Sequence, residues 1–175
     1  MARIMSANVC GVYSALEPLE ELSIFYMLHT KFADIGKYQF SCSATHPLVK
    51  GSQWCHDCAK CYRNYVFSLA IGIDPASIGF KQDMTLKTNL DHNMDADEVL
   101  DYDMTLASYI LQKAHPEIYR RLPEKGAADI SKEQLLKHFF SLRPHSNLPP
   151  AYATKMIRIY DRHLEDFKKT IMKYI

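Results

Sequence analysis

The chain has 175 residues, of which 47% are apolar and 23% charged, and these values are typical of one globular domain. Its net charge of +1 excludes a global electrostatic attraction to nucleic acid or membrane, although it is compatible with a local basic patch. The sequence contains no apolar run of transmembrane length and begins without the apolar core of a secretory signal. We therefore expect a cytoplasmic protein that does not enter a membrane.

The N-terminal part predicts two short strands and two helices. Residues 3–13 contain β-branched and small side chains that favour a strand. A helix is expected to begin at Pro18, because proline suits a first helical turn. Its apolar residues recur every three or four positions at Leu19, Leu22, Phe25, Leu28 and Phe32. Residues 38–42 are expected to form the second strand, and the second helix is expected to run from the cysteine-rich segment to Gly72.

The middle of the chain predicts a loop followed by a helix. Residues 74–95 show little periodicity and are expected to contain at most one short helix. A longer helix is expected to begin near Asp97, with apolar residues at Val99, Leu100, Leu106, Ile110 and Leu111. Pro116 should interrupt or restart it, since proline cannot donate the backbone hydrogen bond that a helix interior requires.

Two further helices are expected near the C-terminus. Ser131 and Gln134 have the spacing of a capping box, and Ile130 with Leu135 matches a hydrophobic staple, which predicts a helix over residues 131–142. A linker is marked by Pro144, Pro149 and Pro150. The last segment places apolar side chains on one helical face at Tyr152, Met156, Tyr160, Leu164, Phe167 and Ile171. A continuous helix here would be about 37 Å long, at about 1.5 Å per residue, and its apolar face predicts core packing or a subunit interface.

These elements predict a predominantly helical α/β or α+β fold, with short N-terminal strands, a loop stapled at the cysteine-rich segment and a helical C-terminal half. Residues 1–80 would hold the strands and the cysteine site. Residues 81–175 would form a helical region packed on that part, so that both belong to one compact domain.

The strongest chemical signal is a group of four cysteines. Four of the five cysteines fall within twenty positions as C-x12-C-x2-C-x2-C, at Cys42, Cys55, Cys58 and Cys61. Two-residue gaps let successive thiolates converge on one ion, and a cysteine distant in sequence then closes the tetrahedron. In a reducing cytoplasm, clustered cysteines favour metal binding or redox chemistry over disulfides. The spacing therefore predicts a structural Zn²⁺ site with Cys42 as its fourth ligand.

Other interpretations of these cysteines stay open. C-x2-C-x2-C is also the spacing of bacterial ferredoxins, so an iron–sulfur cluster is the alternative cofactor, although no C-x3-C-P element follows Cys61. Unligated core or redox cysteines are the third interpretation. His46 and His56 are reserve ligands, but a single histidine in such a loop is more often a solvated side chain. Cys10 stands apart and is expected to be a small buried apolar residue.

A tetrathiolate site has consequences for its surroundings. Four thiolates around one Zn²⁺ leave a local charge of about −2. The basic residues expected to offset it are Lys50, Lys60 and Arg63. The loop of residues 43–54 has few apolar anchors, whereas structural zinc supplies about 10–16 kcal/mol in small peptides. Chelation should therefore loosen residues 42–62.

Three segments surround the cysteines in the order LEPLEELSIFYMLHTKF, KYQFSC and QWCHDCAKCYRNYVFSLAIGIDP. Together they resemble the C-terminal part of PP-loop ATP pyrophosphatase-type enzymes, such as 7-cyano-7-deazaguanine synthase. The resemblance covers about residues 15–80. It implies that Cys42, Cys55, Cys58 and Cys61 bind zinc, as four cysteines do in that synthase. It also implies a nucleotide, deazapurine or tRNA-modification context, with a PP-loop half or companion subunit as partner.

The chain departs from those enzymes in its phosphate-binding motifs. It lacks the N-terminal S-G-G-x-D-S loop that holds pyrophosphate in them, and it has neither a Walker A nor a G-x-G-x-x-G motif. No Ser-His-Asp or Cys-His nucleophile signature can be placed either. We therefore expect either the C-terminal portion of a longer enzyme or a relative without the catalytic half, and no catalytic residue is assigned.

An acidic segment follows the middle loop. Asp91, Asn93, Asp95 and Asp97 are spaced like calcium ligands, but an EF-hand requires Gly and Glu where this chain has Ala96 and Tyr102. The neighbouring carboxylates are expected to favour a helix N-terminus through its dipole, with a divalent-metal or general-base role as the alternative. They are Asp95, Asp97, Glu98, Asp101 and Asp103.

Basic residues gather in two C-terminal segments. They are Arg120, Arg121, Lys125, Lys132 and Lys137, and then Lys155, Arg158, Arg162, Lys168, Lys169 and Lys173. On helices such residues usually form the solvated face, but interleaved tyrosines leave contact with RNA open. The alternative functions are therefore a non-enzymatic zinc module that binds RNA or a protein partner, and an iron–sulfur redox protein. The apolar face of the last helix is also compatible with a homo-oligomer.

Overall fold

The computed structural model of the chain describes residues 14–16, 19–39, 42, 53–86, 102–122, 131–140 and 150–174. These ranges are predominantly helical and contain no strand. The α-helices are α2 (Glu21–Thr30), α3 (Ala33–Gly36), α4 (Ala59–Ala70), α6 (Tyr102–Ala114), α7 (Pro116–Tyr119), α8 (Lys132–Phe140) and α9 (Pro150–Tyr174). Two short 3-10 helices, η1 (Pro75–Ile78) and η2 (Met84–Leu86), follow α4.

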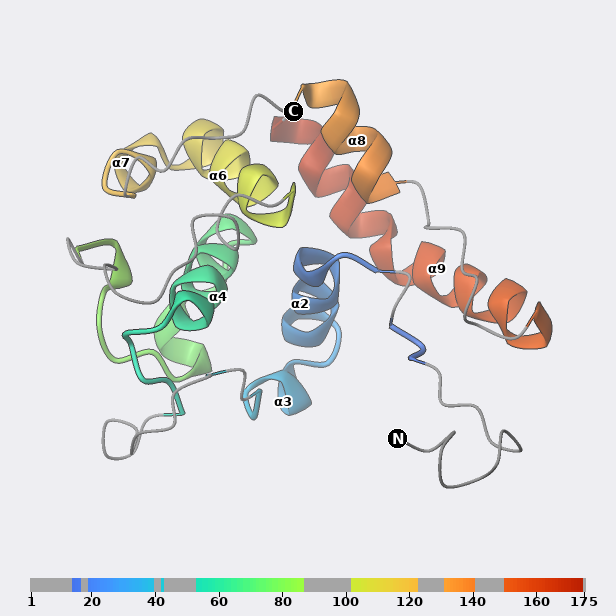
Figure 1. Ribbon diagram of the computed structural model, residues 1–175, viewed down its shortest axis with the longest axis horizontal. Helices are drawn as coiled ribbons and strands as arrows, with labels where there is room; N and C mark the ends of the chain where they lie inside the picture. Colours follow the sequence, from blue (N-terminus) through green and yellow to red (C-terminus); the bar gives the residue numbers. More distant parts are fainter. Residues whose placement is uncertain are drawn as a thin grey trace, which may run out of the picture.

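Helix α4 packs closely against α6 (Figure 1). Most of its circumference is buried, including Val66, Phe67 and Ser68. It begins after Cys58 and is followed by Gly72, whose φ of +76° is a left-handed conformation that residues with a Cβ rarely adopt. The predicted helix from the cysteine segment to Gly72 is thus confirmed.

One hydrophobic cluster joins the long helices. Leu22 of α2, Phe67 of α4, Leu106 of α6, Leu135 of α8 and Ile171 of α9 are all fully buried in it. Burial of each such side chain contributes about 1.5–3 kcal/mol relative to exposure. The helical C-terminal segments therefore share their core with the helices on either side of the cysteines.

The apolar stripe predicted for the first helix is only partly buried in the hydrophobic core. Helix α2 begins at Glu21, and Leu22 and Phe25 face the core. Phe32 lies beyond the end of α2 and is 43% exposed. The stripe therefore ends where the helix ends, because helical spacing places side chains on one face only while the helix continues.

The second predicted strand is not formed at residues 38, 39 and 42, which are the part of it that the structure describes. Residues 3–13 lie outside the described ranges. Within residues 38–42, Tyr38 and Gln39 form a turn, and their N–H groups donate to carbonyls of α3 at 2.9 Å each. Gly36 lets α3 fold back tightly onto α2, since a Cβ at this position would lie 2.5 Å from a carbonyl oxygen of α2. This tight reversal favours the turn over an extended strand.

The breaks between the C-terminal helices follow the predictions. Helix α7 starts at Pro116, immediately after α6 ends. The capping box is confirmed, because the Ser131 N–H donates to Gln134 Oε1 at 2.8 Å and the Gln134 N–H donates to Ser131 Oγ at 3.2 Å. The predicted staple residue Ile130 lies outside the described ranges, as do the residues around Asp97.

Helix α9 is one continuous element whose two halves differ. Its C-terminal half lies beside α8 and α2, whereas its N-terminal half projects away from the other helices (Figure 1). The predicted stripe is buried at Tyr160, Leu164, Phe167 and Ile171. Tyr152, in contrast, is 63% exposed. Pro150 belongs to the helix and not to a linker, because its φ suits the first helical position.

Within the described part of the chain, no helix is both long enough and apolar enough to cross a membrane. Helix α9 has sufficient length at 25 residues, but charged residues are spread along it.

Candidate metal centre

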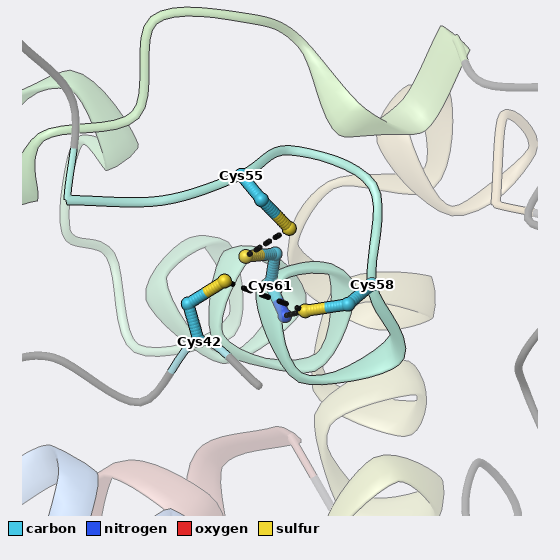
Figure 2. A group of neighbouring side chains, drawn as sticks. All are labelled: Cys42, Cys55, Cys58 and Cys61. Atoms are coloured by element: carbon cyan, nitrogen blue, oxygen red, sulfur yellow. Dashed lines mark hydrogen bonds between the residues drawn. The ribbon is translucent and has the colours of Figure 1, made fainter. Parts of the chain in front are cut away.

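Four cysteine sulfurs from two separate segments meet beside the start of α4 (Figure 2). All four Sγ atoms lie within 4.8 Å of one another. The Sγ atoms of Cys42 and Cys58 are 3.9 Å apart, and those of Cys55 and Cys61 are 3.6 Å apart. A disulfide requires an S–S distance of about 2.05 Å, and none of these four cysteines forms one. The sequence prediction that these four residues come together is therefore fulfilled in the geometry.

A tight turn aims backbone N–H groups at these sulfurs. The Asp57 N–H donates to Cys55 Sγ and the Cys61 N–H donates to Cys58 Sγ, both at 3.4 Å. His56 adopts a φ of +60°, a left-handed conformation that reverses the chain directly after Cys55. Cys58 is the N-cap of α4, where the helix dipole also favours negative charge on the sulfur. The local backbone is thus arranged to stabilise thiolates.

The crowded sulfurs do not favour bare thiolates. Burial raises the pKa of Cys55 above its ordinary value. Hydrogen bonding to Cys58, followed by burial, raises the pKa of Cys61, while the backbone N–H of His56 acts in the opposite direction. A cation removes this penalty, because thiol protons leave as the metal binds. The arrangement suits a bound cation better than four isolated charges.

Aromatic side chains pack against the turn that contains Cys55 and Cys58. Trp54 is fully buried, stacks on Phe80 with a centroid distance of 4.6 Å, and donates its Nε1–H to the Ile78 carbonyl at 2.7 Å. The His56 ring packs edge-on against Phe80, and its Nε2 accepts the Lys81 N–H at 2.9 Å. His56 is therefore a structural residue, because the lone pair of this nitrogen is already in use. The other reserve ligand, His46, lies outside the described ranges, as does Cys10.

A partly buried chain of hydrogen bonds positions Gln39, which precedes Cys42 by three residues. Gln39 accepts a hydrogen bond from His29 Nε2 of α2 at 2.6 Å. Its Nε2–H donates to Asn64 Oδ1 of α4 at 3.2 Å, and the Asn64 Nδ2–H donates to the Lys60 carbonyl at 2.7 Å. Sequence reasoning missed Gln39 and Asn64, because no local pattern marks an amide pair that joins a turn to a helix 25 positions away.

The basic residues expected around the cysteines are placed differently. Arg63 Nε lies 2.8 Å from Glu21 Oε2, and Arg63 Nη2 lies 3.3 Å from Asp103 Oδ2. It is thus paired with two carboxylates, and an offset of the thiolate charge by Arg63 stays a prediction. Lys60 is exposed on the first turn of α4, and Lys50 lies outside the described ranges.

Of the acidic residues predicted near a helix N-terminus, Asp103 is the one that the structure describes. Asp103 is buried in the first turn of α6, as the prediction of a carboxylate near a helix N-terminus requires. Its carboxylate also accepts a hydrogen bond from the first turn of α2, which the sequence did not predict.

Comparisons with protein-family models, curated proteins and solved structures found no match. Cys42, Cys55, Cys58 and Cys61 form a group that could hold a metal ion.

Proposed function

We propose that Cys42, Cys55, Cys58 and Cys61 bind one Zn²⁺ in a closed site whose role is structural. The observation that carries this proposal is the mutual approach of the four sulfurs. Around one zinc, with Zn–S of about 2.3 Å, the edge of a tetrahedron of sulfurs is about 3.8 Å. The distances of 3.6 and 3.9 Å between the two sulfur pairs match that edge.

The same distances weigh against a multi-iron cluster. In a [4Fe–4S] cluster each thiolate binds a different iron, so the four sulfurs must stand farther apart than around one shared ion. An upper limit of 4.8 Å for every pair favours a single ion. A single iron bound by four thiolates would have a similar geometry, and metal analysis separates it from zinc.

A closed tetrathiolate site has no open coordination position for water or substrate, so the ion would supply no Lewis-acid step. Its contribution would be to join the segment at Cys42 to the start of α4. The backbone N–H groups of Asp57 and Cys61 would hold the sulfurs of Cys55 and Cys58 in position for the ion.

Elemental analysis of freshly purified protein tests the proposal. We expect one zinc per chain, and loss of zinc in Cys61→Ser. Cys10→Ser is the matched control, because it removes the remaining cysteine and should leave the zinc content unchanged. Iron with visible absorbance in protein purified without oxygen, or full zinc content in Cys61→Ser, would contradict it.

We further propose that the chain is the zinc-binding part of a PP-loop-type protein that acts on a nucleotide, deazapurine or tRNA-type substrate. The support is the order of segments over residues 15–80, in which a helix precedes Cys42 and a C-x2-C-x2-C motif enters the next helix. The zinc would hold the wall of a substrate pocket.

This second proposal requires an S-G-G-x-D-S segment, either in the same gene or in a companion gene. When both parts are produced together, they should co-elute in size-exclusion chromatography. Co-elution should fail for Cys61→Ser and persist for Cys10→Ser. Separate elution of the intact partners would contradict the family context and leave the zinc proposal standing.

A further inference from the structure

Charge is unevenly distributed between α9 and the remainder of the chain. Helix α9 contains six Lys or Arg residues against three Asp or Glu residues, whereas the whole chain has a net charge of only +1. The other parts together are therefore slightly acidic. A local excess of this kind attracts an anionic partner even though the net charge of the protein is close to zero.

The cations in the N-terminal half of α9 lie outside the ion pairs of this helix. Its three carboxylates are all neutralised by lysines, in the pairs Asp161–Lys168, Glu165–Lys169 and Asp166–Lys31. Lys155, Arg158 and Arg162 are exposed and form no ion pair within the described part of the chain. Lys173 near the C-terminal end of α9 is the fourth such cation of this helix within the described part of the chain, so most of the unbalanced charge lies in the N-terminal half of the helix.

These three cations form a single ridge. Their spacing of three and four residues places them on one face of the helix, over about 10 Å at about 1.5 Å per residue. Next to this ridge, Tyr152 is 63% exposed and Ile159 is 36% exposed. The ridge lies on the half of α9 that projects away from the other helices (Figure 1).

We propose that this ridge, Lys155, Arg158 and Arg162 with Tyr152, is a contact surface for a nucleic-acid backbone. Lysine and arginine are the usual partners of phosphate oxygens, and exposed tyrosine offers a face for base stacking. A projecting helix is convex and enters a groove of its partner, and nucleic acids present grooves bordered by phosphates.

Other occupants fit the surface less well. A second copy of α9 would bring like charges together, because no carboxylate precedes Asp161 in this helix. A membrane surface would need a longer exposed apolar face, whereas the stripe from Tyr160 to Ile171 is already buried in the core. Helix α9 packs on α2 and α6. The residues that carry this inference are separate from the four cysteines, so the inference does not rest on the metal centre.

Fluorescence anisotropy of metal-loaded protein with labelled single-stranded RNA, duplex RNA and duplex DNA tests the proposal. We expect binding at low salt to at least one probe. If the three cations each contact one phosphate, log K should fall with log salt at a slope of about −2 to −3. The triple change Lys155→Glu, Arg158→Glu and Arg162→Glu should weaken binding at least about tenfold and flatten this slope.

The matched control variant reverses three positive charges on other exposed parts of the protein, through Lys113→Glu, Lys132→Glu and Lys137→Glu. It should alter the affinity much less than the ridge variant does. Tyr152→Ala should weaken the binding of single-stranded RNA more than the binding of duplex DNA. Far-UV circular dichroism verifies that both triple variants remain folded.

Three outcomes would overturn the proposal. They are no binding of any probe at low salt, equal loss of affinity in the ridge and control variants, and ridge-dependent binding only to anionic lipid vesicles or to polyglutamate. The last would assign the ridge to a membrane or to an acidic protein.

Discussion

The Asp103 carboxylate accepts a hydrogen bond from the backbone N–H of Leu22 at 2.8 Å, across 81 positions of sequence. Leu22 lies in the first turn of α2, where backbone N–H groups have no partner inside the helix. The N-cap residue of α2, Glu20, makes no capping hydrogen bond with its side chain. A residue of α6 therefore caps α2, and Arg63 of α4 pairs with the same carboxylate.

This three-helix junction predicts a large stability loss on removing the carboxylate. Asp103→Ala leaves the Leu22 N–H and the Arg63 guanidinium without this partner, and both side chains of the ion pair are nearly buried. We expect a decrease in the free energy of unfolding of about 3 kcal/mol, measured by urea denaturation. Asp161→Ala, at an exposed ion pair, should cost less than about 1 kcal/mol. Equal losses in the two variants would refute the junction's role.

Metal removal should act on the segment around the cysteines. A chelator is expected to increase proteolysis within residues 42–62, because the proposed ion joins Cys42 to the start of α4. The only tryptophan, Trp54, is fully buried next to Cys55 and should report the change through a red shift of its emission. Cys10→Ser protein should respond in the same way. Unchanged cleavage and emission after complete metal loss would disprove the structural role.

Stability should also depend on pH through His29. Burial lowers the pKa of His29 below 6.5, although its hydrogen bond with Gln39 acts in the opposite direction. Between the folded and the unfolded pKa, the unfolded state binds more protons. Stability from this group is therefore present above about pH 6.5 and is lost as the pH falls from there to the folded pKa.

His29→Gln removes this titration, so its free energy of unfolding should fall less steeply than that of the wild type below about pH 6.5. Urea denaturation at a series of pH values measures the difference. His115→Gln, at an exposed histidine, is the control and should keep the wild-type slope. Parallel curves for His29→Gln and wild type would contradict the prediction.

The two faces of α9 should differ in their contribution to stability. Phe167 is 2% exposed and stacks on Tyr26 of α2 with a centroid distance of 4.6 Å. Phe167→Ala should lower the free energy of unfolding by about 3–5 kcal/mol, since it leaves a cavity between two helices. Met172 is 58% exposed, and Met172→Ala should change stability by less than about 1 kcal/mol. Thermal or urea unfolding measures both.

Local rules were sufficient for several parts of this protein. The capping box at Ser131, the restart at Pro116 and the helix end at Gly72 follow from interactions between residues a few positions apart. The cysteine spacing belongs to the same class, because Cys55, Cys58 and Cys61 lie within one turn and the beginning of a helix. These features could be predicted because neighbouring residues alone determine them.

Tertiary contacts decided the rest. Gln39 and Asn64 hold the segment that leads to Cys42, and Asp103 caps a helix far away in sequence. The periodicity of α9 predicts one apolar face, but only the positions of α2, α6 and α8 determine which half of that face is buried. The sequence alone determined which residues can bind a metal or form helices. The fold decided which of them meet, because long-range contacts depend on packing between helices and not on spacing along the chain.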